Sequence, residues 1–169
     1  AEAMRGRIPV RPTSIVKEID RQQTTIINGI DGLDKRPLKG VNVIVASTDV
    51  HEFGKEISKT VLQKAGAEVF DLGTNVAIAE LGDTVIETES RAVLISTYNG
   101  IAFSFGEEMV KTFRNLGIDV PIVMGGRLNE PMDGSDLPVD VADRLAAMGI
   151  NVDNDIDKIV DYLVKVLDL

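Results

Sequence analysis

From residue 41 onward, the sequence alternates between short apolar runs and segments whose apolar residues have helical spacing. The first run, VNVIVAS at residues 41–47, is continuous and β-branched, as expected of a strand buried on both faces of a sheet. Similar runs follow at residues 68–72, 91–97, 121–124 and 150–152, and helices are predicted for residues 52–65, 76–89, 104–115, 139–148 and 154–167. This alternation, with short connections, predicts an α/β fold: a flavodoxin-like or Rossmann-like parallel five-stranded sheet with helices on both faces.

Capping residues mark the start of two of these helices. Ser104 and Glu107 have the spacing of a capping box, and Asn154 is expected to cap the last helix. Residues 127–137 are expected to form a loop before the helix at 139–148.

Residues 1–40 differ from the rest of the chain. Residues 5–12 (RGRIPVRP) contain two prolines and no periodicity, which indicates an arm or linker. Isoleucines recur near helical spacing between Thr13 and Ile30, which predicts an appended helix. We therefore divide the chain into an N-terminal arm and helix, residues 1–40, serving as a linker or partner contact, and a domain at residues 41–169.

The composition excludes several classes of site. The chain of 169 residues has no cysteine and one histidine, His51, which excludes disulfides, thiolate zinc sites, cysteine nucleophiles and sites that need two histidines. A formal net charge of −9 argues against nucleic-acid binding, because an acidic chain repels phosphates. No apolar run approaches the roughly 20 residues that span a bilayer, and no signal-peptide pattern opens the sequence. We expect a cytoplasmic protein that binds neither nucleic acid nor membrane.

Ligands of such sheets bind beyond the carboxyl ends of the strands. The segment after the first strand lacks the glycines and the Lys-Ser/Thr pair of a phosphate-binding loop, and the sequence lacks GxGxxG there. A response-regulator receiver needs a phosphoacceptor aspartate after the third strand, where this chain has Ser96. The first segment does offer Asp49 two residues before His51, a spacing at which a carboxylate can orient an imidazole as a metal ligand.

Each of these segments, taken alone, also has a purely structural interpretation. Asp49 can be a helix cap, with His51 an exposed residue at the helix start. Residues 96–100 can be a polar turn, and Gly125-Gly126 can be a plain turn.

Taken together, the segments resemble the cobalamin-binding domain of the methylmalonyl-CoA mutase, glutamate mutase and methionine synthase superfamily. The signature of that family is Asp-x-His-x-x-Gly, then Ser-x-Leu, then Gly-Gly. Residues 49–54 (DVHEFG) match the first element, residues 96–98 (STY) match the second with tyrosine for leucine, and residues 125–126 match the third. The resemblance covers roughly residues 41–167, so it implies that residues 41–169 are a cobalamin-binding domain.

The resemblance implies that His51 replaces the cofactor's dimethylbenzimidazole as the lower, axial ligand to cobalt. Asp49 would hold the ring of His51, Ser96 would hydrogen-bond the displaced base, and the glycines would make room for the nucleotide tail. The implied cofactor contacts are Thr48, Asp49, Val50, His51, Glu52, Gly54, Ser96, Thr97, Tyr98, Gly125, Gly126 and Arg127. No residue for substrate chemistry is identified in this chain.

Two departures from the family pattern bear on the site. Many relatives place a lysine two or four residues before the aspartate, where this chain has Ser47 and Val45. Tyr98 is bulkier than the family's leucine and changes the shape of the pocket for the nucleotide tail.

The family contains two kinds of chemistry. We favour an adenosylcobalamin-dependent mutase, an isomerase whose small-molecule substrate lies on a partner barrel subunit or domain, because only about 40 residues precede the first strand. The alternative is a corrinoid protein that carries a methyl group, with methylcobalamin, and HEFGK at residues 51–55 and DLG at residues 71–73 resemble that branch. A non-catalytic cobalamin carrier or sensor is a third possibility.

Overall fold

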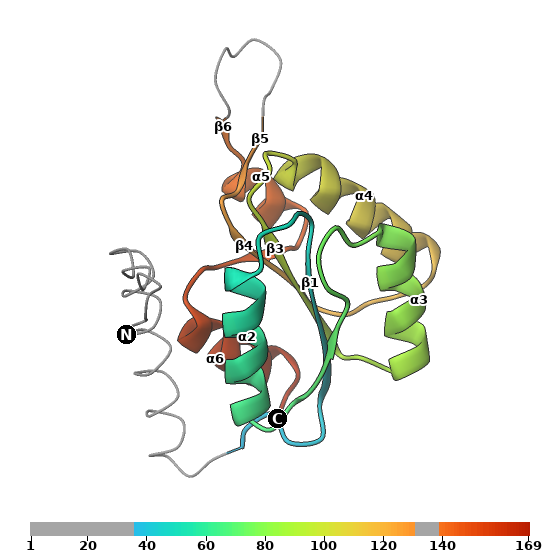
Figure 1. Ribbon diagram of the computed structural model, residues 1–169. Helices are drawn as coiled ribbons and strands as arrows, with labels where there is room; N and C mark the ends of the chain where they lie inside the picture. Colours follow the sequence, from blue (N-terminus) through green and yellow to red (C-terminus); the bar gives the residue numbers. More distant parts are fainter. Residues whose placement is uncertain (1–35, 131–138) are drawn as a thin grey trace, which may run out of the picture.

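The computed structural model describes residues 36–130 and 139–169. Within these residues, five parallel strands form one sheet in the order β2-β1-β3-β4-β7 (Figure 1). The strands are β1 (Asn42–Ser47), β2 (Glu68–Asp71), β3 (Ala92–Thr97), β4 (Ile122–Gly126) and β7 (Asn151–Val152). The predicted fold class, a flavodoxin-like parallel sheet with helices on both faces, is confirmed.

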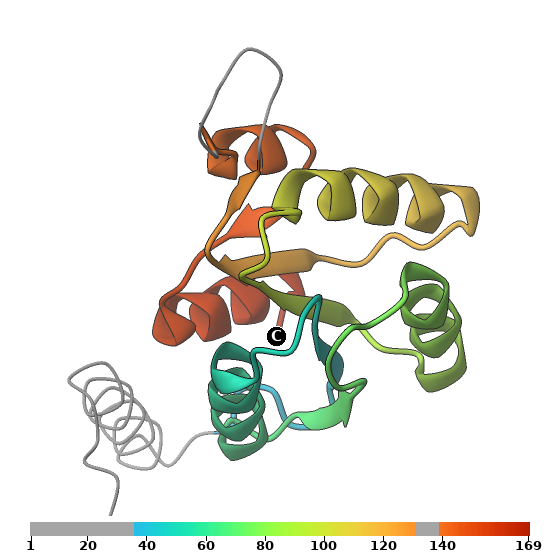
Figure 2. The same cartoon turned by 45° about the horizontal axis from the view of Figure 1, so that its top comes forward.

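Two groups of helices cover the sheet, one on each face (Figure 2). The helices are α2 (Phe53–Lys64), α3 (Ile78–Thr88), α4 (Ala102–Asn115), α5 (Ala142–Ala147) and α6 (Ile156–Val166). Successive strand residues point to opposite faces, so Ile44 and Ala46 pack toward α3 and α4, whereas Val43 and Val45 pack toward α2 and α6. The continuous apolar run of β1 thus contributes to both cores.

Strand register brings the predicted segments to one edge of the sheet. Ser47 pairs with Ser96 across β1 and β3, and Ser96 pairs with Gly125 across β3 and β4. Thr97 pairs with Gly126 in the same way. Both glycines belong to β4, so the interpretation of Gly125-Gly126 as a plain turn is wrong.

The helix predicted at residues 139–148 is shorter than expected. Val139–Asp140 form β6, which pairs antiparallel with β5 (Asn129–Glu130) inside the segment predicted to be a loop. The helix α5 begins at Ala142, whose N–H donates to the Asp140 carboxylate at 2.8 Å. The β5–β6 ribbon lies at the carboxyl edge of the sheet, beside α5 (Figure 1).

Both predicted caps are wrong. The helix α4 begins at Ala102, so Ser104 lies inside its first turn, where the backbone N–H and Oγ of Ser104 donate to Glu130 at 2.8 and 2.6 Å. The helix α6 is capped by Asp155, whose side chain accepts from the N–H of Asp157 at 3.1 Å. The two side chains expected to cap helices instead bind residues that are distant in the sequence: Ser104 binds Glu130, and Asn154 binds Gly126.

The predicted arm and the helix at residues 13–30 lie outside the described residues, so the division at residue 40 remains a prediction. Within the described ranges, no helix combines the length and the apolar character that crossing a membrane requires.

Candidate cofactor site at the carboxyl edge of the sheet

Asp49 and His51 form a hydrogen-bonded pair in the loop that follows β1. Oδ1 of Asp49 accepts the backbone N–H of His51 at 2.8 Å and lies 3.0 Å from ring atom Nδ1. Ser47 Oγ donates to the same oxygen at 3.3 Å. The Asp49 side chain is 6% exposed, whereas the His51 side chain is 57% exposed. A buried carboxylate therefore fixes the ring and leaves Nε2 for a ligand.

Asp49 also joins this loop to the loop after β3. Its second oxygen, Oδ2, accepts the backbone N–H of Tyr98 at 2.6 Å. Burial alone would raise the pKa of Asp49, but hydrogen bonds from the His51 and Tyr98 backbones and from the His51 ring lower that pKa below its ordinary value. Asp49 is thus a carboxylate at neutral pH and can accept the Nδ1 proton of His51.

Two buried hydroxyl groups connect the same two loops. Thr48 Oγ1 donates to Thr97 Oγ1 at 2.8 Å, and Thr97 Oγ1 donates to Asn99 Oδ1 at 3.3 Å. Thr48 and Thr97 therefore use their hydrogen-bonding groups inside the protein, and a contact of either residue with a cofactor remains a prediction.

The surroundings of His51 are apolar and exposed. The Tyr98 ring lies 5.5 Å from the His51 ring, centroid to centroid, with an interplanar angle of 48°. Val50 and Phe53, which flank the histidine in sequence, are 70% and 60% exposed. A cluster of large exposed apolar side chains is more typical of a surface that binds a ligand or partner than of a surface that faces only solvent.

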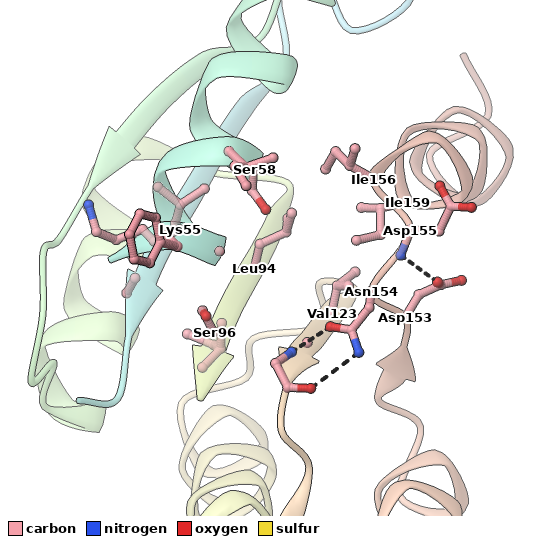
Figure 3. A pocket seen from close by; sticks show the side chains of 18 of the residues that line it. Lys55, Ser58, Leu94, Ser96, Val123, Asp153, Asn154, Asp155, Ile156 and Ile159 are labelled. Carbon is pink, nitrogen blue, oxygen red and sulfur yellow. Dashed lines mark hydrogen bonds between the residues drawn. The ribbon is translucent and has the colours of Figure 1, made fainter. Parts of the chain in front are cut away.

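A cavity of about 710 Å³ opens beside this loop, between α2 and α6 (Figure 3). Its apolar lining includes Leu94, Val123, Ile156 and Ile159. Ser96, at the end of β3, also lines the cavity, and its Oγ is buried with no hydrogen-bond partner among the described residues. Because an unpaired buried hydroxyl is unfavourable, Ser96 Oγ is available to hydrogen-bond a polar group that enters the cavity.

Three glycines line this cavity at positions where a side chain would collide with the protein. A Cβ on Gly54 would lie 2.8 Å from Ser96 Oγ, and a Cβ on Gly125 would lie 2.8 Å from the carbonyl oxygen of Asp153. A Cβ on Gly126, whose φ is +102°, would collide with the carbonyl oxygen of Thr97. No side chain fits at these positions without a shift of the backbone or of Ser96.

Asn154, which the sequence predicts to cap the last helix, belongs to this site instead. Its Oδ1 accepts the N–H of Gly126 at 2.6 Å and its Nδ2 donates to the Gly126 carbonyl at 3.2 Å, as the dashed lines in Figure 3 show. Asp153 and Asp155 line the same side of the cavity. All three residues follow the last strand of the sheet, so the strand-end rule could have identified them.

The structure separates the remaining predicted residues from the cavity. Val50, Glu52 and Arg127 are exposed and do not belong to the cavity lining. Arg127 is nevertheless anchored at the sheet edge, because its N–H donates to the Thr97 carbonyl at 2.8 Å. No group of three or more potential metal ligands from histidine, cysteine or acidic residues occurs within residues 36–130 and 139–169.

Comparison with known proteins finds similarity to a family of cobalamin-binding domains. The sequence profile described as the B12 binding domain matches residues 39–143. Over 94 residues the chain is 33% identical to the glutamate mutase sigma subunit of Carboxydothermus hydrogenoformans, covering 54% of this chain and 69% of that subunit. Over 93 residues it is 32% identical to dimethylamine corrinoid protein 3 of Methanosarcina acetivorans, covering 52% of this chain and 44% of that protein.

A solved structure shares the fold. The cobalamin-binding protein from Desulfitobacterium hafniense DCB-2 superimposes with a TM-score of 0.65 and 22% sequence identity, covering 87% of this chain and 70% of that one. The aligned part of this chain spans less than half of the dimethylamine corrinoid protein.

Proposed function

This chain belongs to the B12-binding domain family, and from that premise we propose that it binds cobalamin with the nucleotide base displaced from cobalt and with His51 as the lower ligand. The observation that carries the proposal is the Asp49–His51 pair beside a cavity in which buried Ser96 Oγ has no partner among the described residues. His51 Nε2 would bind cobalt, Ser96 would hydrogen-bond the displaced base, and Gly54 and the glycines of β4 would leave room for the nucleotide tail.

The donor set supports this proposal over a simple metal site. The site offers one exposed imidazole oriented by a buried carboxylate, and no group of three or more potential metal ligands occurs among the described residues. A cation bound there has to arrive with most of its ligands already in place, as cobalt does in a corrin ring. A hydrogen bond from Nδ1 to Asp49 would increase the basicity of Nε2 and would keep the imidazole ring in one orientation.

The chemistry that we favour is an adenosylcobalamin-dependent rearrangement carried out with a barrel-type partner that binds the small-molecule substrate. Bound cobalamin supplies a cobalt–carbon bond, which is cleaved homolytically in a mutase and heterolytically in a methyl transfer. Similarity to a glutamate mutase sigma subunit, of which the aligned region covers 69%, supports the mutase. The exposed ring of His51 would present the cofactor outward, toward such a partner.

Methyl transfer is the second candidate, and a specific contact favours it. Lys55 and Asp71, which belong to the two segments that resemble methyl carriers, form an ion pair with Nζ and Oδ2 2.8 Å apart. The similarity to a dimethylamine corrinoid protein points the same way. A carrier or sensor without catalytic partner is the remaining alternative.

Histidine ligation can be tested without any substitution, because the chain contains one histidine. The protein is produced with ¹⁵N-histidine, loaded with cobalamin and reduced to Co(II). If His51 is the lower ligand, the nitrogen hyperfine splitting changes from a triplet in unlabelled protein to a doublet. A triplet that persists after labelling would show that the cofactor's own base remains on cobalt and would contradict the proposal.

The class of chemistry is decided by which cobalamin is active. A mutase requires adenosylcobalamin and a barrel partner, whereas a methyl carrier exchanges the methyl group of methylcobalamin with a methyltransferase.

We also propose that residues 1–40 act as the linker or partner contact. Deletion of residues 1–12 should then leave cobalamin binding unchanged and weaken association with the partner, as measured by analytical ultracentrifugation.

A further inference from the structure

Lys55, a buried residue in the first turn of α2, forms an ion pair with the partly exposed Asp71 at the end of β2. The Lys55 side chain is 2% exposed, and its Nζ lies 2.8 Å from Asp71 Oδ2. Glu56 contacts the same ammonium group, and Glu52 Oε1 lies 3.9 Å from it. Although burial would lower the pKa of Lys55, hydrogen bonds to Asp71 and Glu56 raise that pKa, so Lys55 is charged at neutral pH.

Stability of the helix does not explain this arrangement. A positive charge in the first turn of a helix is unfavourable, because that end of the helix already carries partial positive charge. Burying an ion pair also costs desolvation that a packed apolar pair of similar volume would avoid. The pair therefore needs another explanation, and the contacts of Asp71 provide one.

Asp71 anchors the loop that connects β2 to α3, and this loop lies along the backbone that leads to His51. Oδ1 of Asp71 accepts the N–H of Gly73 at 2.8 Å. The Gly73 carbonyl in turn accepts the N–H of Ser47 at 2.9 Å, and the N–H of Asn75 donates to the carbonyl of Asp49 at 3.2 Å. Asp71 thus acts on the residues just before His51, while its partner Lys55 lies just after it.

The segment from Ser47 to Lys55 is therefore held at both ends through one carboxylate. We propose that the Lys55–Asp71 pair is a positioning device that keeps the His51 ring bonded to Asp49 before any cofactor binds. Lys55 belongs to the cavity lining, but its side chain extends toward β2 and away from α6, as Figure 3 shows, so its charge is directed at Asp71. The inference rests on the proposed function for the identity of the ligand, but the ring orientation belongs to the unloaded protein.

A preformed lower ligand has a functional consequence. A ring already held in place loses little conformational entropy on binding, so affinity is gained without new contacts. The chain would then bind cobalamin with histidine ligation in the absence of a catalytic partner.

The experiment uses nitrogen NMR of the full chain labelled with ¹⁵N-histidine, without cofactor, at a pH where the ring is neutral. We expect the wild-type proton to reside on Nδ1, because Asp49 accepts it. In Lys55→Met, we expect a mixture of the two tautomers and several-fold faster hydrogen exchange of the His51 amide. Cobalamin affinity, measured by absorbance titration, should fall about 10-fold, as for other partners that orient a metal ligand.

Lys59→Met is the matched control. Lys59 Nζ lies 3.2 Å from the same Asp71 oxygen, but its side chain is 32% exposed and it stands one turn further along α2. This variant should retain the wild-type tautomer and affinity. An equal disturbance by Lys59→Met would overturn the specific role of Lys55.

Thermal unfolding separates positioning from stability. A lower unfolding midpoint with an unchanged tautomer in Lys55→Met would overturn the inference, because the pair would then act on stability alone. If Lys55→Met does not fold, Asp71→Asn gives the same test with a nearly isosteric side chain. If the tautomer responds but cobalamin fails to bind through His51, the proposed function fails and the positioning role stands.

Discussion

The two sides of the candidate site are built by different means. On the side of α2, the Asp49 carboxylate accepts hydrogen bonds from His51, Tyr98 and Ser47, and the Lys55 charge is neutralised by Asp71. On the side of α6, Asp153, Asp155 and Asp157 lie close together, and the amide of Asn154 both accepts from and donates to the backbone of Gly126.

This difference assigns different tasks to the two sides. The α2 side satisfies its polar groups internally and orients a single imidazole, which suits a ligand position that must not move. The cavity between the two helices instead depends on the absence of side chains at Gly54 and Gly125 and on the unpaired Ser96 hydroxyl. The Ser96 hydroxyl would gain a hydrogen-bond partner from a ligand that enters the cavity.

The largest expected effect is the loss of the imidazole from the α2 side. His51→Ala should abolish histidine ligation, which is read from the Co(II) hyperfine pattern, and should weaken cobalamin binding by more than any other single change. Ile86→Ala, at an exposed apolar residue of α3 outside the cavity lining, should change neither by more than about twofold. A histidine-type signal in the His51→Ala protein would contradict the assignment.

Asp49→Asn should have the next largest effect. Asparagine has one acceptor oxygen and no charge, so it cannot accept from both His51 and Tyr98 as Asp49 does. The ring is then held less firmly, and cobalamin affinity should fall about 10–100-fold, less than for His51→Ala. An unaltered affinity and spectrum would show that Asp49 is only a helix-start residue.

The same substitution should change the acid stability of the unloaded protein. The pKa of Asp49 is lower in the folded chain than its ordinary value of about 3.9, so its charge stabilises the fold above that value. This stabilisation is lost as the pH falls through the folded pKa. Asp49→Asn should therefore have a smaller decrease in urea midpoint between pH 5 and pH 2 than wild type, and an equal decrease would contradict it.

A third substitution tests the contrast between a hydroxyl without a hydrogen-bond partner and a hydroxyl that has one. Ser96→Ala removes a buried hydroxyl without a partner in the described structure, so the unloaded protein should be as stable as wild type or about 1 kcal/mol more stable, while cobalamin binding weakens. Thr97→Val removes a hydroxyl that is bonded to Thr48, and it should destabilise the unloaded protein by about 1 kcal/mol. Denaturant unfolding and absorbance titration measure the two quantities, and equal stability losses in both variants would contradict the contrast.

The sequence predicted the parts of the molecule that depend on local pattern. Buried β-branched runs located β1 and β3, and the three motif elements located Asp49–His51, Ser96 and the two glycines at the ends of β1, β3 and β4. The errors arise where a distant residue competes for a local group. The Ser104 hydroxyl binds Glu130, which is 26 positions away, and Val139–Asp140 pairs with Asn129–Glu130 instead of starting a helix.

The ion pair between Lys55 and Asp71 shows the same limit at the site. Lys55 and Asp71 belong to two separate sequence segments that resemble one branch of the family, and they are 16 positions apart in the chain. Their contact depends on how α2 packs on the edge strand β2, which no local pattern specifies. The role of Asn154 was missed for the related reason that it stands beside Asp155, and either residue can cap a helix.

The smallest expected effect lies on the acidic side. Partial desolvation of the carboxylate, together with the charges of Asp155 and Asp161, raises the pKa of Asp157 in the folded chain, so its carboxylate weakens the fold above that pKa and has no effect once it is protonated. Asp157→Asn should increase stability at pH 7 and leave it unchanged at pH 3.

The gain should stay below about 0.5 kcal/mol, because Asp157 is exposed and solvent screens its interactions. Asp143→Asn, at an exposed acid in the first turn of α5, controls for the loss of one charge near a helix start. Urea midpoints at both pH values, with and without 0.5 M salt, measure the effect, and salt should reduce it. A loss of stability at pH 7 would show that attraction between Asp157 and the start of α6 outweighs repulsion among the acids, and the two sides of the site would then differ less than their contacts indicate.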